Sequence, residues 1–476
     1  MSAALAATAQ AVRDLASVLK DHPPPFTLRP DQIEVIEDKV GYPRAGLYAE
    51  VGTGKTVMAT YLSLCWNAEV NVVVMPPILF KQWHRWLSSI PGIGEILIYR
   101  GTPKQRKAMD LTRPKWILMS IGILKNDYQH IHKSLAHKTK TVDVDEATSI
   151  KNPTSGNHKA VASLAEDSNL ALLTGTPLST PHDAYAYVKL ITPGIYRSKT
   201  QFENIHVEER DFFENVVKWK NLELMQANLM LHSARLLKEN VLKDLKKPNY
   251  IPFEYELDPE HMALYKVLAE EQLILLESGG KIDATSASKL YNALQQIIVN
   301  WDYFSGYEDA RSTTFDLIDH VMDSAAVMNP KNSKLIIASY YQMTSAKILT
   351  YLQEFGAVGM YGAISPRQQE INSERFTFDP TCRIAVIQPM SGGFGSNYQH
   401  VCSEVLFAEA PRMPLHFNQI VGRVYRDGQP NVPNIHIGIA SGTIQNRLFQ
   451  NLLNNDQLLN RVQGGYQDLR EAVYGN

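Results

Sequence analysis

The sequence predicts an α/β protein with two parallel-sheet domains in tandem and helical insertions between them. Short apolar and β-branched runs alternate with polar or helical stretches over residues 45–190, and the same alternation returns from residue 334. This rhythm is typical of parallel strands joined by crossover helices. Residues 195–330 show mainly helical periodicity instead. The chain of 476 residues also exceeds the roughly 100–200 residues of one domain.

The expected strands are short apolar runs that end in polar or loop-forming residues. In the first domain they are 46–49, 70–75, 96–99, 116–119, 141–144 and 170–173. In the second domain they are 334–340, 357–361, 383–388, 404–408 and 434–439. Between them, 202–247 and 259–276 are expected to be helical, with one β-like run at 250–257. The middle of the chain should therefore be mostly helical.

The composition is that of an ordinary soluble protein. Hydrophobic residues make up 44% of the chain and charged residues 20%, which permits a sizeable core and excludes a disordered chain. Lys and Arg total 47 against 49 Asp and Glu, a formal charge of −2. Because the chain as a whole has no basic field, any nucleic-acid surface must be local.

Signals of secretion, zinc binding and membrane insertion are absent from the sequence. Cys65, Cys382 and Cys402 are far apart and form no CxxC pair, which indicates a reducing compartment and no zinc site. The first 20 residues carry apolar residues at helical spacing and predict an amphipathic helix, with an organellar presequence as the alternative. The longest apolar run, 70–80, is shorter than the about 20 residues that cross a bilayer, so no membrane segment is expected.

A phosphate-binding loop is predicted directly after the first strand, where residues 49–56 read AEVGTGKT and a helical stretch follows. Its two glycines let backbone N–H groups converge on phosphate oxygens at a helix N-terminus. Lys55 can reach the β- and γ-phosphates, and Thr56 can offer an oxygen to Mg²⁺. Ala49 replaces the glycine of the strict motif, but strand, loop and helix occur in the required order.

An acidic pair, Asp145 and Glu146, follows the strand at 141–144. Asp at a strand end can hold Mg²⁺ through water, and the adjacent Glu can orient and deprotonate the water that attacks in line. In isolation such a pair is more often a solvated turn. Downstream of a phosphate loop and before a further strand, the catalytic interpretation is favoured.

Two further motifs follow the phosphate loop and the acidic pair in the sequence. The turn LTGTPL at 173–178 follows the next strand, and taken alone a structural turn is the simpler interpretation. The second domain supplies QIVGRVYRDGQ at 419–429. Arg423 and Arg426 are three residues apart, so on a helix they share a face and can both act on the γ-phosphate as arginine fingers. A solvated basic turn is the alternative.

In that order, these motifs resemble those of superfamily-two helicase-like translocases, and several stretches are similar to the Swi/Snf-type ATPases in particular. Those stretches are LRPDQ at 28–32, PP at 76–77 before QW at 82–83, DEATSIKN at 145–152, LTGTPL at 173–178, SGGFGSN at 391–397 and RVYRDGQ at 423–429. The resemblance covers roughly residues 26–445. It implies two RecA-like lobes, the ATP-binding lobe at 1–247 and the C-terminal lobe at 248–476, with helical protrusions at about 195–245 and 258–330.

The resemblance implies roles for the motif residues toward ATP and Mg²⁺. The catalytic residues would be Lys55, Asp145, Glu146, Arg423 and Arg426, and Thr56 and Asp145 would hold Mg²⁺. The residues expected to contact the nucleotide, with Gln32 at the adenine edge, are Gln32, Gly52, Thr53, Gly54, Lys55, Thr56, Gly395 and Gln419.

The resemblance also implies DNA contacts. The family's DNA-tracking motifs would map to Pro76, Lys81, Gln82, Trp83, Thr174, Thr176, Ser339, Tyr340, Ser391, Gly392 and Gly393. Small residues and backbone N–H groups that grip phosphates allow a motor to move without reading the base sequence. Core packing is the alternative interpretation for Trp83 and for Tyr340.

Two residues and one segment depart from the family pattern. Thr148 replaces the usual His, so the link between hydrolysis and the DNA-binding motifs is expected to be tuned differently. Asp143 stands where the family has an apolar strand residue, and a buried carboxylate requires a partner. The basic segment at 235–247 lacks one Arg, and it is expected either to contact DNA phosphates or to form a solvated helix face.

Together these expectations describe an ATP-dependent DNA translocase that moves on double-stranded or branched DNA. It would remodel forks or junctions by branch migration, fork regression or annealing, in replication, recombination or repair. Because the motifs nearly fill the chain, a minimal monomeric motor is expected, in the cytoplasm of a bacterium or a virus-infected cell rather than in a nucleus, with room for a protein partner. The alternatives are a strand-separating helicase on DNA or RNA and an ATP-switched clamp that displaces a partner protein from DNA.

Overall fold

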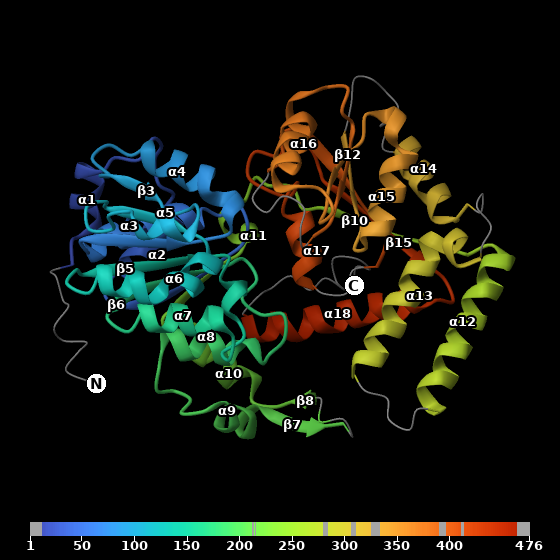
Figure 1. The fold of residues 1–476 in the computed structure, drawn as a ribbon, viewed down its shortest axis with the longest axis horizontal. Coiled ribbons are helices and arrows are strands. Elements are labelled where there is room, and N and C mark those ends of the chain that lie inside the picture. The colour runs from blue at the N-terminus through green and yellow to red at the C-terminus, as the bar shows by residue number, and fades with distance from the viewer. Residues whose placement is uncertain are drawn as a thin grey trace. The chain divides into compact units, whose positions relative to one another are not determined.

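The computed structural model describes residues 12–211, 214, 216–278, 284–305, 311–324, 334–389, 397–410 and 414–463. Two compact units divide the chain, with the main boundary between Lys243 and Asp244, and the described residues 458–463 are grouped with the first unit. Each unit contains a parallel sheet with helices packed against it, as Figure 1 shows. The prediction of two RecA-like parallel-sheet domains in tandem with helical insertions is therefore confirmed.

The first unit is built on a 7-stranded sheet with the order β3-β4-β2-β5-β6-β1-β9, whose neighbouring strands are all parallel. Its strands are β1 (Arg44–Ala49), β2 (Val70–Val74), β3 (Ile96–Ile98), β4 (Trp116–Met119), β5 (Lys140–Asp145), β6 (Ser168–Leu173) and β9 (Ser233–Leu236). All but β9 coincide with predicted runs. Because the strands are parallel, the segments that follow β1, β2, β5 and β6 emerge at one edge of the sheet.

Helices bury both faces of this sheet. They are α1 (Leu15–Asp21), α2 (Pro30–Lys39), α3 (Lys55–Trp66), η1 (Pro77–Leu79), α4 (Phe80–Ser88), α5 (Pro103–Lys107), α6 (Ile121–Ser134), η2 (Ala147–Ile150), α7 (Gly156–Leu164) and α8 (Asp183–Ile191). Neighbouring residues of β2 enter different cores, since Val72 packs on one side and Val73 on the other. Burial on both faces explains why the strands are nearly continuous apolar runs.

The prediction of helix throughout 202–247 is wrong. This segment folds as α9 (Lys199–His206), an antiparallel hairpin of β7 (Val207–Arg210) and β8 (Val216–Trp219), α10 (Leu222–Met230), β9 and α11 (Lys238–Val241). β9 spans only 4 residues. It exists because it pairs with β1, which lies far away in the sequence, and local periodicity carries no signal of that pairing.

The second unit has a 6-stranded parallel sheet with the order β10-β15-β14-β11-β13-β12. Its strands are β10 (Asn249–Tyr255), β11 (Lys334–Ala338), β12 (Val358–Met360), β13 (Ile384–Ile387), β14 (Cys402–Phe407) and β15 (Asn434–Ala440). The predicted β-like run at 250–257 is β10, and it forms one edge of this sheet. The helices that follow β11 are α15 (Gln342–Tyr351), η3 (Gln353–Phe355), α16 (Pro366–Phe378), α17 (Pro414–Val421) and α18 (Ile444–Gln463).

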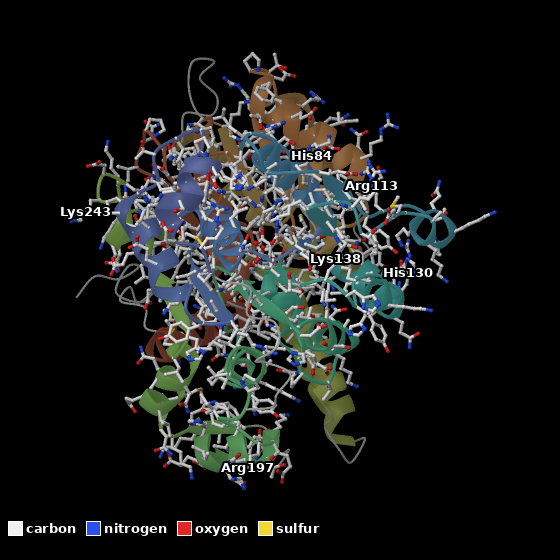
Figure 2. All side chains as sticks on the ribbon, turned by 90° about the vertical axis from the view of Figure 1, so that its left-hand side faces the viewer. His84, Arg113, His130, Lys138, Arg197 and Lys243 are labelled. Atoms are coloured by element: carbon white, nitrogen blue, oxygen red, sulfur yellow. The ribbon has the colours of Figure 1, made fainter. Side chains whose placement is uncertain are left out.

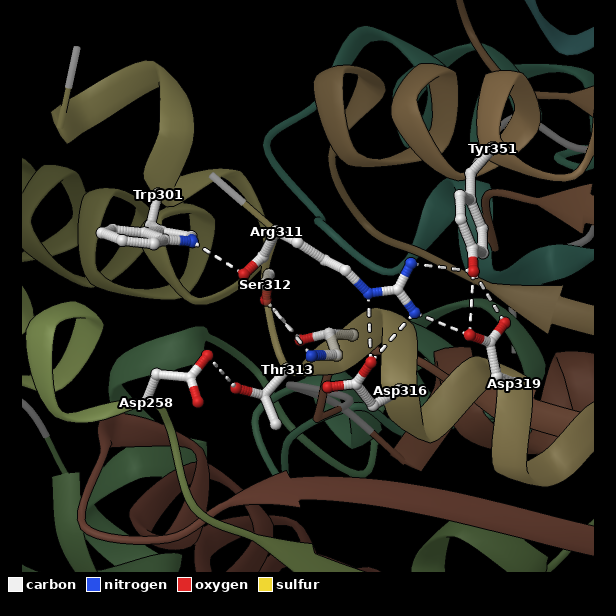
Figure 3. A network of polar contacts seen from close by, with 9 residues as sticks. Asp258, Trp301, Arg311, Ser312, Thr313, Asp316, Asp319 and Tyr351 are labelled. Atoms are coloured by element: carbon white, nitrogen blue, oxygen red, sulfur yellow. Dashed lines mark hydrogen bonds and ion pairs between the residues drawn. The ribbon is translucent and has the colours of Figure 1, made fainter. Parts of the chain in front are cut away.

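A helical insertion precedes β11 in the second unit. It consists of α12 (Pro259–Ser278), α13 (Ala284–Ser305) and α14 (Thr314–Ser324). Figure 3 shows a polar network that connects the insertion to α15, in which Arg311 donates hydrogen bonds to Asp316 and Asp319 of α14 and to the hydroxyl of Tyr351 on α15. The indole of Trp301 donates to the Arg311 carbonyl at 3.1 Å. Because the ion pairs are largely exposed, they contribute little to stability.

The helices, the cysteines and the N-terminal segment can each be compared with what the sequence predicts. Within the described ranges, every helix is too short or too polar to cross a bilayer. All three cysteines are buried free thiols. Of the predicted N-terminal amphipathic helix, the described part is α1, which buries Leu15 and Val18.

Candidate functional site

The phosphate loop joins β1 to α3, as the sequence predicts. Gly52 and Gly54 have φ values of 92° and 93°, a region that residues with a side chain rarely adopt. A Cβ on Gly54 would lie 2.1 Å from Nε2 of Gln32. The loop therefore requires glycine at position 54 both for its backbone conformation and for the close approach of Gln32.

Lys55 begins α3 with its ammonium group turned back toward the loop. Its Nζ donates to the carbonyl of Ala49 at 2.8 Å and to that of Glu50 at 3.3 Å. Burial raises the pKa of Asp145, and the charge of Lys55 acts in the opposite direction. The loop therefore holds a cation beside the carboxylate that ends β5.

Gln32 on α2 and Arg29, the N-cap residue of that helix, support this loop. Nε2 of Gln32 donates to the Thr53 carbonyl at 3.3 Å, and the guanidinium of Arg29 donates to the same oxygen at 2.7 Å. Oε1 of Gln32 accepts from the Arg29 backbone at 3.1 Å. Contact between Gln32 and adenine stays a prediction, whereas its contact with the loop is direct. Sequence reasoning missed Arg29, although it lies inside the LRPDQ motif.

The carboxylate of Asp145 is held from two sides. Its Oδ1 accepts from the backbone N–H of Glu146 at 2.9 Å, and its Oδ2 accepts from the indole of Trp83 at 2.8 Å. Glu146 itself has φ 53° and ψ 55°, a left-handed conformation that is uncommon for a residue with a side chain. Backbone strain of this kind gathers at active sites, where it aims a side chain. Glu146 is half-buried, as a residue that meets water and substrate requires.

Asp143 has the partner that its burial demands. It is fully buried, and the hydroxyl of Ser63 on α3 lies 3.1 and 2.9 Å from its two oxygens. Burial, reinforced by the charge of Asp145, raises the pKa of Asp143 to about 8. The departure from an apolar residue therefore ties β5 to the helix that begins with Lys55.

The threonine turn after β6 lies against the phosphate loop. A Cβ on Gly175 would be 3.4 Å from the backbone nitrogen of Val51. Thr174 is fully buried, and its hydroxyl accepts from the backbone N–H of Thr176 at 3.2 Å. Lys151 in the DEATSIKN stretch donates to the Ser179 hydroxyl at 2.7 Å. These contacts join three of the sequence motifs in one cluster.

Neither interpretation of the basic segment at 235–247 describes Arg235. It lies on β9, not on a helix, and its guanidinium donates to the carbonyls of Tyr48 at 3.1 Å and Gly175 at 2.8 Å. The backbone of Lys238 donates to the Glu50 carboxylate at 2.7 Å. This part of the segment therefore braces the phosphate loop, while Lys243, Lys246 and Lys247 are exposed.

The predicted DNA contacts of the first unit divide between surface and core. Lys81 and Gln82 on α4 are exposed, and Pro76, between β2 and η1, is half-buried. Trp83 is fully buried, so the prediction that it contacts nucleic acid does not fit the structure. Core packing, the alternative interpretation, describes Trp83, because helical spacing places it on the buried face of α4.

In the second unit, Ser339 and Tyr340 follow β11 and are bound to a buried carboxylate that the sequence did not reveal. The carboxylate of Glu409 accepts from the Tyr340 backbone at 2.6 Å and from the Ser339 hydroxyl at 3.3 Å. Ser339 is fully buried, and the Tyr340 hydroxyl is buried with no hydrogen-bond partner among the described residues. Tyr340 as a whole is partly exposed, so nucleic-acid contact and core packing both stay predictions for it.

Glu409→Gln is expected to make folding stability less dependent on pH. Burial raises the pKa of Glu409 from 4.5 to about 7, so the folded chain keeps a proton that the unfolded chain releases. The stability from this neutral acid is complete below about pH 4.5 and is lost as pH rises through about 7. Urea midpoints of wild type should therefore fall more than those of Glu409→Gln between about pH 5 and pH 8. Glu374→Gln, an exposed change on α16, is the control, and equal falls in all three proteins would contradict the prediction.

Arg423 and Arg426 do not share a helix face, because α17 ends at Val421 and both residues lie in the turn after it. Tyr398 donates its backbone N–H to the Arg423 carbonyl at 3.0 Å, and Arg426 donates to the side chain of Asn397. Burial and the neighbouring charge of Arg423 lower the pKa of Arg426 to about 10. The turn therefore gathers two cations that repel each other, an arrangement that an anion such as phosphate relieves.

The remaining predicted residues fall in different places. Gln419 is half-buried on α17. Ser391, Gly392, Gly393 and Gly395 lie outside the described residues.

The first unit fits a magnesium nucleotide. Its loop offers backbone N–H groups and an ammonium group to phosphates, and Thr56 and Asp145 offer oxygen ligands beside them. No group of three or more potential metal-ligating side chains occurs among the described residues.

Comparisons with known proteins agree with this arrangement. The model of the SNF2-related domain matches residues 43–300, more than half of the chain. The human DNA annealing helicase and endonuclease ZRANB3 is 23% identical over 90% of this chain and 39% of its own length. The CHD3-type chromatin-remodeling factor CHR7 of Arabidopsis thaliana is 21% identical over 88% of this chain and 36% of its own length. The chain thus spans less than two fifths of these two relatives.

Two further similarities cover most of both chains. The uncharacterized ATP-dependent helicase YqhH of Bacillus subtilis is 22% identical over 95% of this chain and 82% of its own length. The SWI2/SNF2 ATPase core of Sulfolobus solfataricus, solved in complex with dsDNA, has a TM-score of 0.42 and 21% identity, covering 96% of this chain and 99% of that one. The chain belongs to the SNF2-related family, and it is an ATP-hydrolysing, helicase-like enzyme.

Proposed function

We propose that this ATPase moves along double-stranded or branched DNA and remodels forks or junctions in replication, recombination or repair. The nucleotide machinery and the family support the motor. The similarity to ZRANB3, a DNA annealing helicase, supports a branched substrate. The buried free thiols support our further proposal of a reducing cytoplasm as its location.

The observation that carries DNA binding is a local basic surface on the first unit. Residues 100–140 contain ten Lys and Arg but only two Asp and Glu, whereas the whole chain has a formal charge of −2. Two of these cations are buried and paired, Arg106 with Asp127 and Lys140 with Asp167. The exposed ones are Arg100, Lys104, Lys107, Arg113, Lys125 and Lys133. Figure 2 shows Arg113, His130 and Lys138 on one face of this unit.

A local excess of Lys and Arg can bind a polyanion although the chain as a whole has a formal charge of −2. None of the six exposed cations forms an ion pair with another residue of the described chain. Phosphate contacts of this kind are independent of base sequence, as a motor that travels along DNA needs. We therefore assign DNA to this surface together with Lys81 and Gln82.

The chain's own residues account for the hydrolysis that drives such movement. Bound ATP with Mg²⁺ would supply the transferable γ-phosphoryl group. The glycine loop and Lys55 neutralise phosphate charge, while Asp145 is oriented by Trp83 and by the backbone of Glu146. The Glu146 carboxylate orients a water molecule and accepts its proton.

Steady-state ATPase assays with matched nucleic acids test this function. Duplex or forked DNA should stimulate turnover strongly, and Lys104→Glu with Lys107→Glu should raise the DNA concentration needed for half-stimulation and make it less sensitive to salt. Lys266→Glu, an exposed change on α12, is the control. Stimulation only by single strands or RNA would favour the strand-separating helicase, and no stimulation would favour the partner-displacing clamp. Failure to move a synthetic Holliday junction or fork despite stimulation would contradict the remodelling role.

A further inference from the structure

Helix α4 has one face toward the core and one toward solvent. Phe80, Trp83 and Leu87 are buried, at a spacing that places them on one side of the helix. Lys81 and Gln82 are exposed on the other side. The helix therefore carries candidate DNA contacts immediately beside a fully buried indole.

That indole reaches the nucleotide machinery. Trp83 is 0% exposed and Asp145 is 7% exposed, and the distance from Nε1 to Oδ2 is 2.8 Å. An indole N–H can only donate a hydrogen bond, so the contact has a fixed direction. A hydrogen bond to a carboxylate away from water is among the stronger polar contacts in a protein.

The other oxygen of Asp145 continues the connection to the residue assigned as the base. Oδ1 accepts from the backbone N–H of Glu146 at 2.9 Å, and Glu146 is in the left-handed conformation. The carboxylate is thus fixed between α4 and the strained turn. A shift of α4 on its DNA side would therefore alter the orientation of Asp145 and of the Glu146 backbone.

We infer that Trp83 is a positioning residue that couples DNA contact on α4 to the nucleotide site through Asp145. The inference rests on the proposed DNA-translocase function and deepens it by naming the connection between the two sites. It also gives Trp83 a role that core packing alone does not require, because an apolar ring would fill the same space without an N–H group.

Trp83→Phe tests this role by keeping an aromatic ring and removing the donor. The measurement is the Kd of a fluorescent blunt duplex with and without a non-hydrolysable ATP analogue and Mg²⁺. In wild type the analogue should change this Kd by about 5- to 150-fold, the usual size of coupling between two sites. In Trp83→Phe the ratio should approach one, while the duplex still binds without nucleotide. The analogue's own Kd, measured with and without duplex, should change by the same factor because coupling is reciprocal.

Trp86→Phe is the matched control. Trp86 lies on the same helix, and its indole donates to the Thr60 hydroxyl of α3 at 3.0 Å, away from Asp145. This variant loses an equivalent indole hydrogen bond between α4 and its neighbour, so it should retain the wild-type ratio. A ratio in Trp83→Phe equal to those of wild type and Trp86→Phe would overturn the inference.

Two further outcomes separate the inference from the function on which it rests. A wild-type chain that binds no duplex under any condition would refute both. If Trp83→Phe does not fold, the same question is put to the wild-type chain labelled with ¹⁵N at its tryptophan indoles. One indole resonance should shift when duplex binds and again when the magnesium nucleotide binds, and the absence of any resonance that responds to both would refute the coupling alone.

Discussion

Glu146→Gln is expected to lower ATP turnover by about 10²- to 10⁴-fold, the usual contribution of a general base. Binding of ATP should remain close to wild type, because the phosphate loop and Lys55 are unchanged. The amide has nearly the shape of the carboxylate. The side chain at position 146 also makes no N-cap hydrogen bond to the short helix that follows it, so the substitution removes no such bond. Phosphate release in steady state measures the first effect, and equilibrium binding of a fluorescent ATP analogue measures the second.

Two comparisons make this result specific to the base. Glu166→Gln changes an exposed glutamate of the same unit and should leave turnover unaltered. Lys55→Ala should abolish hydrolysis and also weaken nucleotide binding, because the ammonium group that would neutralise phosphate charge is lost. Near-normal turnover in Glu146→Gln would show that another group takes the proton.

The strands of both sheets could be predicted because each one is a short apolar run buried on two faces. β4 begins at Trp116 and ends at Met119, as predicted, and it is completely buried. Acidic residues come directly at the end of such a run in β5, where Asp145 is the last strand residue and Glu146 follows it, so the strand and the motif support each other's prediction. The phosphate loop was predictable for the same reason, since its glycines are required by local backbone geometry.

The elements that could not be predicted depend on partners far away in the sequence. β9 is a strand only because β1 offers it an unpaired edge, and the residues Ser233–Leu236 carry no strong strand signal of their own. Arg235 likewise acquires its role from the carbonyls of Tyr48 and Gly175, which local sequence does not place beside it. Helical periodicity in 202–247 was therefore a misleading local signal.

The supporting contacts of the site were hidden for a related reason. The sequence indicated that Asp143 needs a partner, but only the packing of α3 on β5 shows that Ser63 supplies it. Trp83 had two interpretations, and only the layering of α4 over the sheet directs its indole toward Asp145. Glu409 lies 69 residues from Tyr340 in the chain, so its contact with that backbone exists only in the folded unit.

Arg423→Ala or Arg426→Ala should lower ATP turnover on the order of 10³-fold or more if these residues stabilise the transferred phosphoryl group. The structure gives each a fixed place: the Arg423 backbone is held by Tyr398, and Arg426 is held by Asn397. Burial, and after it the charge of Arg423, lowers the pKa of Arg426, and an anion beside the pair would offset both effects. Turnover at saturating ATP and DNA is the measurement that isolates this effect from binding.

A conservative variant at Arg423 and a variant at a distant arginine distinguish an arginine finger from a basic surface turn. Arg423→Lys keeps the charge but loses the planar fork that matches phosphate oxygens, so most of the loss should persist. Arg447→Ala, an exposed change on α18, should leave turnover near wild type. If Arg423→Ala and Arg426→Ala behave like Arg447→Ala, the two arginines form only a basic turn. In that case the transition-state charge must be neutralised by Lys55 and Mg²⁺ alone, and the second unit would serve DNA contact rather than hydrolysis.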